Sequence, residues 1–103
     1  MNLVDTLKVN DILVREFGYS MTLYEFYKVV ARKNKTVKLL PSKDRVVSTE
    51  GFMQYRVEPV IPTGYLTKDI ITKRFNKYGD ISIGNDVLGI YSPDIKYVEN
   101  HAD

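Results

Sequence analysis

The sequence predicts a mainly β protein, a small antiparallel barrel or sandwich, with an SH3-like barrel as the first choice. The chain contains eight tyrosines and four phenylalanines in 103 residues, and aromatic and β-branched residues favour strands. No window has a sustained apolar stripe at helical spacing, which argues against long helices. Frequent turn residues divide the chain into five to seven short expected strands, the pattern of a small all-β fold.

The first part of the chain predicts a three-stranded meander. Strands are expected at 11–17 and 23–32 around a loop at 18–20, and both have apolar residues on both faces, as a curved strand shared between two layers would. A tight turn at Lys33-Asn34-Lys35 should follow, because Asn tolerates left-handed backbone angles. The third strand is expected at 36–40, with Val37 and Leu39 inward and Lys38 outward.

The remaining elements are expected to be short. Residues 41–50 are polar and are expected to form a loop, and Gly51 should open a strand at 52–57. Residues 67–75 fit either a short helix capped by Thr67 or a strand, and the strand is favoured for the second half. Final strands are expected at 80–83 and 87–91, with a frayed tail at 100–103. We expect residues 1–103 to form a single domain.

Composition limits the location and the chemistry. Hydrophobic residues make up 44% of the chain and charged residues 27%, which is typical of a globular protein. Cysteine is absent, which excludes disulfides and thiolate metal sites. No signal-peptide pattern and no membrane-length apolar run is present. We therefore expect a cytoplasmic protein without membrane contact.

Charge is distributed unevenly along the chain. Residues 28–77 contain twelve lysines and arginines against four acids, a net charge of +8, whereas residues 80–103 contain five acids against one lysine. Two arrangements are compatible with this pattern. The basic middle could form a positive face, or the acidic tail could fold back and neutralise it.

No pattern in the sequence predicts catalysis. His101 is the only histidine and is expected to be a solvated tail residue, and no serine has a neighbouring base. Asp80 and Asp86 flank a glycine turn but lack the acidic spacing of a calcium loop. The scattered glycines form no phosphate-binding loop. We therefore expect a protein that is not an enzyme and that uses no metal and no cofactor.

Two groups of residues are candidates for binding. The first is a basic set on the hairpin at 28–45, where side chains could follow a phosphate backbone; the alternative is a solvated hairpin whose lysines protect a sheet edge. The second is an aromatic loop after Gly18, whose Tyr19 could contact a partner protein or stack on a base. The alternative, which is the commoner role for such a residue, is that Tyr19 anchors the loop. The basic set is Arg32, Lys33, Lys35 and Lys38, joined by Lys73 and Arg74, and the partner-binding set is Tyr19, Met21 and Tyr24.

The beginning of the chain also resembles a known family. Its pattern reads Val9-x-Asp11-Ile12-Leu13, then Phe17-Gly18-Tyr19, Thr22 and Phe26-Tyr27-x-Val29-Val30. This pattern is similar to an uncharacterised family of small phage and mobile-element proteins that read V-G-D-I-L, W-G-Y, a Thr and D-F-Y-x-V-V. The chain departs from it at Asn10, Phe17 and Glu25, and the similarity covers residues 8–32.

The resemblance implies a genetic context and no functional residues. Small phage proteins without catalytic residues often bind host machinery, and anti-CRISPR inhibitors are one such class. Our leading hypothesis is a non-enzymatic phage-type inhibitor that binds a host defence complex and occludes a nucleic-acid or partner site. The alternative is direct DNA or RNA binding through the basic hairpin. A third hypothesis is a homodimer or larger homo-oligomer with edge strands paired between copies.

Overall fold

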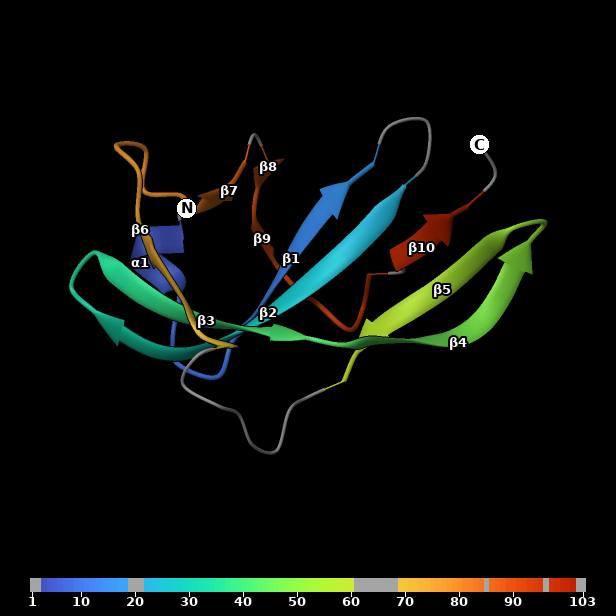
Figure 1. Ribbon diagram of the computed structural model, residues 1–103, viewed down its shortest axis with the longest axis horizontal. Coiled ribbons are helices and arrows are strands. Elements are labelled where there is room, and N and C mark those ends of the chain that lie inside the picture. The colour runs from blue at the N-terminus through green and yellow to red at the C-terminus, as the bar shows by residue number, and fades with distance from the viewer. Residues whose placement is uncertain (1–2, 19–21, 61–68, 85, 96, 102–103) are drawn as a thin grey trace.

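The structure is a computed structural model that describes residues 3–18, 22–60, 69–84, 86–95 and 97–101. These residues form ten short strands and one helical turn, and the strands pair into three antiparallel sheets (Figure 1). The predicted mainly β class is confirmed. The elements are α1 (Leu3–Thr6), β1 (Ile12–Phe17), β2 (Leu23–Lys33), β3 (Thr36–Ser42), β4 (Asp44–Gly51), β5 (Gln54–Pro59), β6 (Ile71–Arg74), β7 (Ser82–Ile83), β8 (Asp86–Val87), β9 (Gly89–Ile90) and β10 (Tyr97–Asn100).

The main sheet has the strand order β6-β3-β2-β1-β9. β1 and β2 pair along their whole overlap, and β2 continues through the predicted turn into β3. The meander predicted from the sequence is therefore confirmed. β3 extends two residues beyond the predicted end at 40, because Pro41 and Ser42 still pair with Tyr27 and Phe26.

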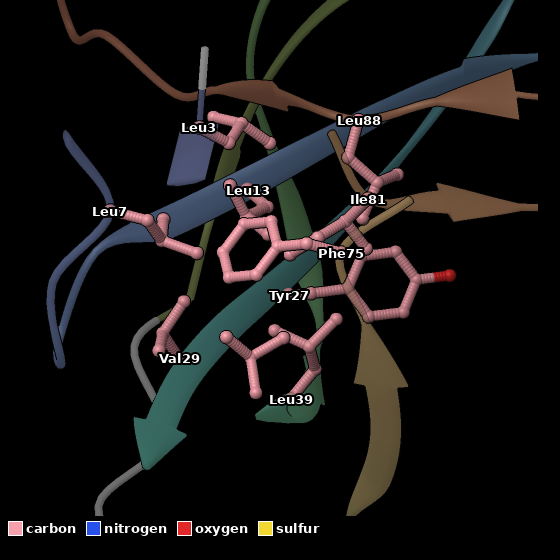
Figure 2. Packing of buried hydrophobic residues seen from close by; sticks show 10 residues of the cluster. Leu3, Leu7, Leu13, Tyr27, Val29, Leu39, Phe75, Ile81 and Leu88 are labelled. Atoms are coloured by element: carbon pink, nitrogen blue, oxygen red, sulfur yellow. The ribbon is translucent and has the colours of Figure 1, made fainter. Parts of the chain in front are cut away.

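Both faces of the β1–β2 pair are covered by apolar side chains, as their sequence predicts. The larger cluster lies on one face, where Phe75 and Ile81 pack over Leu13, Val29 and neighbouring residues (Figure 2). Leu13, Val29 and Ile81 are fully buried, and each such side chain stabilises the fold by about 1.5–3 kcal/mol. The smaller cluster lies on the other face and consists of Phe26, Val57 and Tyr97, with Ile12, Val14, Tyr24 and Tyr91 packed against it.

A second sheet, of order β10-β5-β4, covers the smaller cluster. The chain enters it directly after β3, because β4 begins at Asp44 and pairs with β5. The predicted loop at 41–50 is therefore wrong. Every residue of β4 is exposed, so this strand is held by backbone pairing and has no apolar alternation to indicate it. β5 begins at Gln54 instead of residue 52, because Phe52 and Met53 form the turn and Met53 has a positive φ of 59°.

The fold is a small sandwich, and the SH3-like barrel is wrong. In the residues that the structure describes, the main sheet ends at β6 and β9 and the second sheet ends at β10 and β4. One isolated bridge, Thr22 to Asn100, connects the two sheets. The two sheets pack face to face over the smaller cluster. Because each keeps its own edge strands in the described residues, they do not close into a ring.

The late elements differ in detail from those predicted. β6 at 71–74 confirms the strand in the second half of 67–75 and excludes a helix there, while residues 67 and 68 lie outside the described ranges. Residues 82–90 form three two-residue strands. The frayed tail predicted at 100–103 is wrong for its first two residues: Asn100 pairs with Gln54, and the His101 N–H donates to the Met53 carbonyl at 2.8 Å. No helix in the described part of the chain is long and apolar enough to span a bilayer.

Candidate nucleic-acid interface

The β2–β3 hairpin positions the basic residues that the sequence singled out. Lys33 pairs with Thr36, and Asn34 and Lys35 form the two-residue turn between them. Asn34 has the positive φ, 53°, that the sequence predicted for this turn. Lys33, Asn34 and Lys35 are all exposed, so the turn projects its two lysines into solvent at one end of the molecule (Figure 1).

The third strand of the cluster is β6, which lies beside β3. Arg74 pairs with Thr36 across this edge, so Lys33, Thr36 and Arg74 lie in one cross-strand row on the same face of the sheet. Lys38 lies two residues along β3 and therefore points to the same face. The prediction that Arg74 joins the hairpin lysines agrees with this register.

These residues line an open hollow of about 730 Å³. None of its lining residues is acidic, and no ion pair joins its four cations to a carboxylate within the described residues. Four uncompensated positive charges at one surface attract a polyanion and release its counterions on binding. The lining residues are Lys33, Asn34, Lys35, Thr36, Lys38 and Arg74; Asn34 and Thr36 were not singled out from the sequence, where only their place in the turn indicates them.

Arg32 is half-buried, and its guanidinium points towards α1 and not into this hollow. A bulge between Val29 and Ala31 inserts one residue into β2, so Arg32 pairs with Val37 and shares its buried face. Its guanidinium donates to the Leu7 carbonyl at 2.7 Å and to the Val4 carbonyl at 2.6 Å. It also lies 4.8 Å from the centroid of the Phe75 ring. Arg32 therefore holds the helical turn α1 over the larger cluster, because it satisfies carbonyls that the end of a helix leaves without partners.

Lys73 is likewise separated from the outer row. It pairs with Val37 across the β3–β6 edge and is half-buried, so it lies on the face opposite Arg74. Of the six predicted basic residues, the structure brings together Lys33, Lys35, Lys38 and Arg74. It places the other two on the opposite face of the same sheet.

The predicted partner-binding residues do not form a site in the described chain. Tyr19 and Met21 lie outside the described residues. Tyr24 packs against the smaller cluster with its ring edge-on to Tyr97, 5.4 Å between centroids, and its N–H donates to the buried Glu99 carboxylate. Burial, followed by the charge of Glu16, raises the pKa of Tyr24. This tyrosine therefore stabilises the interior.

Two arginines elsewhere in the described chain form ion pairs away from the hairpin. Arg15 lies between Asp86 and Glu25, with contacts of 2.8 and 2.7 Å, and the Asp86 bond is the main cause that raises the pKa of Arg15. Arg45 forms an ion pair with Glu58 on the second sheet. The last strand of the acidic segment 80–103, β10, pairs with β5, and no described residue of this segment lines the hollow at the basic hairpin. Of the two predicted arrangements, the structure therefore favours a positive face.

No group of three or more His, Asp or Glu side chains in the described ranges could hold a metal ion. His101 is not the solvated tail residue that the sequence predicts. Its Nε2 lies 3.2 Å from Glu99 Oε1, and its ring packs at 5.5 Å from that of Tyr55. The contacts of His101 with Glu99 and Tyr55 hold the end of the described chain against the second sheet.

Comparison of the chain with protein-family models, with curated protein sequences and with solved structures finds no match. The assignment of a function therefore depends on the geometry of the basic surface and on the resemblance described above, which stays a prediction.

Proposed function

We propose that this protein is a non-enzymatic, cytoplasmic accessory protein that binds nucleic acid through the outer face of the β2–β3 hairpin. The observation that carries the proposal is the convergence of Lys33, Lys35, Lys38 and Arg74 on one hollow that contains no acid. The three lysines come from the β2–β3 hairpin and Arg74 comes from β6, about forty positions later in the chain. The fold therefore brings together more positive charge than either segment carries alone.

The chemistry of this surface favours the phosphate backbone over the bases. Lysine and arginine side chains neutralise phosphates at any sequence. Base stacking would require exposed aromatic rings beside the cations. Among the described residues no aromatic side chain lines the hollow, and Phe75 is buried on the opposite face, beside Arg32. We therefore expect binding that depends strongly on salt and weakly on sequence.

Fluorescence anisotropy with labelled single- and double-stranded oligonucleotides at low and moderate salt tests this proposal. If four phosphates are contacted on duplex DNA, the affinity should fall with a log–log slope of about −3.6 in salt concentration. Lys33→Glu combined with Lys35→Glu should abolish binding. The control, Lys8→Glu combined with Lys43→Glu, makes the same change in net charge at exposed positions outside the hollow and should bind nearly as well as the parent.

Two results would contradict the proposal. One is the absence of binding at low salt by protein that is folded by circular dichroism. The other is an equal loss of binding in the hairpin variant and in the control, because a diffuse net-charge effect would not distinguish them.

A second candidate is the phage-type inhibitor that the resemblance implies. We propose that such an inhibitor would use the same basic hairpin to contact the guide or target strand held by a host defence complex, and would thereby occlude it. The observation that favours this version is that the acid-free hollow suits a phosphate backbone, whereas Tyr24 of the predicted partner-binding set lies in β2, half-buried against the smaller cluster.

A cleavage assay with a nucleic-acid-guided nuclease from the host tests the second candidate. The expected result is inhibition by the parent protein that is lost in Lys33→Glu/Lys35→Glu and retained in the control. Inhibition that persists in the hairpin variant would assign the activity to a different surface. If the protein binds free nucleic acid but does not inhibit the nuclease, the result supports nucleic-acid binding and contradicts the role as an inhibitor.

A further inference from the structure

The second sheet ends in an open edge. β4 pairs with β5 on one side and has no other strand neighbour in the described residues, and all eight of its residues are exposed. Open edges recruit strands from other chains. Two register shifts, between Val46 and Ser48 and between Thr49 and Gly51, interrupt this edge. They limit any ladder to short stretches, so side chains at the two ends of β4 must contribute most of any contact.

The two ends of this edge have complementary shapes. At the β4–β5 turn, Phe52 is 86% exposed and Met53 beside it is 37% exposed, which makes a protruding apolar tip. At the other end of the strand, where β4 begins, a hollow of about 400 Å³ opens between the two sheets. It is lined by Ile12, Arg45, Glu58, Pro59, Val60 and Tyr91, so its walls combine apolar surface with one ion pair.

The charges of β4 are also complementary between its ends. Arg45 is the second residue of the strand, beside the hollow, and Glu50 is the last but one, beside the tip. When two copies of this strand lie antiparallel, the beginning of each lies beside the end of the other. Such an arrangement brings Arg45 of each copy near Glu50 of its partner, and the tip of each copy near the hollow of its partner.

We propose that two copies of this chain associate about a two-fold axis with their β4 strands antiparallel, and that Phe52 of each copy enters the hollow of the other. The occupant is a second copy because one surface supplies the tip, the hollow and both charges, which is the self-complementarity that a two-fold interface requires. The 400 Å³ hollow is large enough to receive an aromatic ring. The proposal does not depend on nucleic-acid binding.

The arrangement has a consequence for the proposed function. The β2–β3 turn and the β4–β5 turn lie at opposite ends of the long axis of the molecule, which is 44 Å (Figure 1). Dimerisation through β4 would leave both basic hairpins free, and they would face outward from the pair. A dimer could then hold two segments of one nucleic acid, so long strands would bind more tightly than short ones by effective concentration.

Sedimentation velocity across about 1–100 µM protein tests the dimer, because a contact limited to one interrupted edge strand and its two ends is expected to have micromolar affinity. The mass of the parent protein should rise from 11.9 kDa towards twice that value. Phe52→Asp should weaken association by at least about tenfold, as loss of a buried aromatic anchor does. Val87→Asp is the matched control, because Val87 is an apolar residue, 60% exposed, in β8, which pairs with β7 and not with the second sheet.

A charge exchange locates the contact. Glu50→Arg should weaken the dimer, because it brings two arginines together across the axis. Adding Arg45→Glu and Glu58→Arg should restore it, because the ion pair that Arg45 forms with Glu58 within each copy is reversed together with the intermolecular pair. Circular dichroism shows whether each variant is folded. A short oligonucleotide that occupies one hairpin should bind Phe52→Asp as tightly as it binds the parent, which separates this proposal from the proposed function.

Three results would overturn the proposal. A parent protein that stays at 11.9 kDa throughout the range has no such dimer, and the apolar tip would then be assigned to a different protein partner. A dimer that Phe52→Asp leaves intact uses another surface. A dimer that Phe52→Asp disrupts but Val60→Asp in the hollow does not is joined tip to tip.

Discussion

Arg32 provides the most direct distinction between a structural and a binding role on the basic hairpin. Replacing it with methionine keeps an apolar stem beside Phe75 and removes the guanidinium, which donates to Leu7 O at 2.7 Å and to Val4 O at 2.6 Å. A hydrogen bond that involves a charged group contributes about 1.5–3 kcal/mol. Because these bonds are only partly buried, water recovers a share of that energy, and we expect a loss of about 2–4 kcal/mol in the free energy of unfolding.

A loss of that size is a large fraction of the stability of a small domain, which is about 5–10 kcal/mol. It should lower the melting temperature by about 10–20 °C. Urea unfolding followed by circular dichroism measures the change, and Lys38→Met is the matched control. Lys38 is exposed on the outer face of the same hairpin, so its replacement should change stability by less than about 0.5 kcal/mol.

The same pair of variants should separate the two roles in binding. Below its melting temperature Arg32→Met should bind nucleic acid almost as well as the parent, whereas Lys38→Met should bind more weakly without losing stability. If Arg32→Met is as stable as Lys38→Met and loses affinity instead, then Arg32 is a ligand-binding residue and the reasoning from its carbonyl contacts is wrong.

Three further predictions follow from the described contacts. Arg74→Gln should reduce the salt dependence of duplex DNA binding by about 0.9 in log–log slope, measured by anisotropy, and an unchanged slope would remove this residue from the interface. Phe26→Ala should lower the free energy of unfolding, measured in urea, by about 3–5 kcal/mol. The reason is that the buried ring contacts Tyr91 and Tyr97 edge-on, with 5.7 and 6.0 Å between ring centroids. A loss below about 1 kcal/mol would mean that the smaller cluster does not stabilise the fold. Burial raises the pKa of Tyr24 and Tyr91 in the folded state, so their neutral forms stabilise the fold below pH about 10 and this stability is lost as the pH rises through the folded pKa. The melting temperature of Tyr24→Phe should therefore fall less than that of the parent protein between pH 8 and about pH 11. An equal fall in both proteins would contradict a raised pKa of Tyr24 in the folded state.

The sequence predicted the meander of β1, β2 and β3 because its residues alternate around a turn with an obvious Asn. The same argument failed at β4. An edge strand that buries none of its eight side chains needs no apolar pattern, and only pairing with β5 determines its conformation. The prediction of a barrel was wrong for a related reason. A sheet closes into a barrel only if its two edge strands pair in space, and the alternation of residues along one strand carries no information about that pairing.

The candidate site was predicted in part, and the bulge in β2 explains the difference. With regular alternation, Ala31 would share the inward face of Val29, and Arg32 would point outward. The extra residue between Val29 and Ala31 reverses this order and turns Arg32 towards the interior, where it meets the carbonyls of the helical turn α1. A single inserted residue moves every later side chain to the other face, and neither composition nor charge counting locates such an insertion.

The central claim is that nucleic acid binds on the outer face of the β2–β3 hairpin and β6. The most direct measurement is a titration of isotope-labelled protein with a short oligonucleotide, followed by two-dimensional amide NMR. The account predicts concentrated chemical-shift changes from Lys33 to Lys38 and at Arg74, which disappear when salt is raised. Changes centred on β4, β5 or β10, or no changes at low salt, would contradict it.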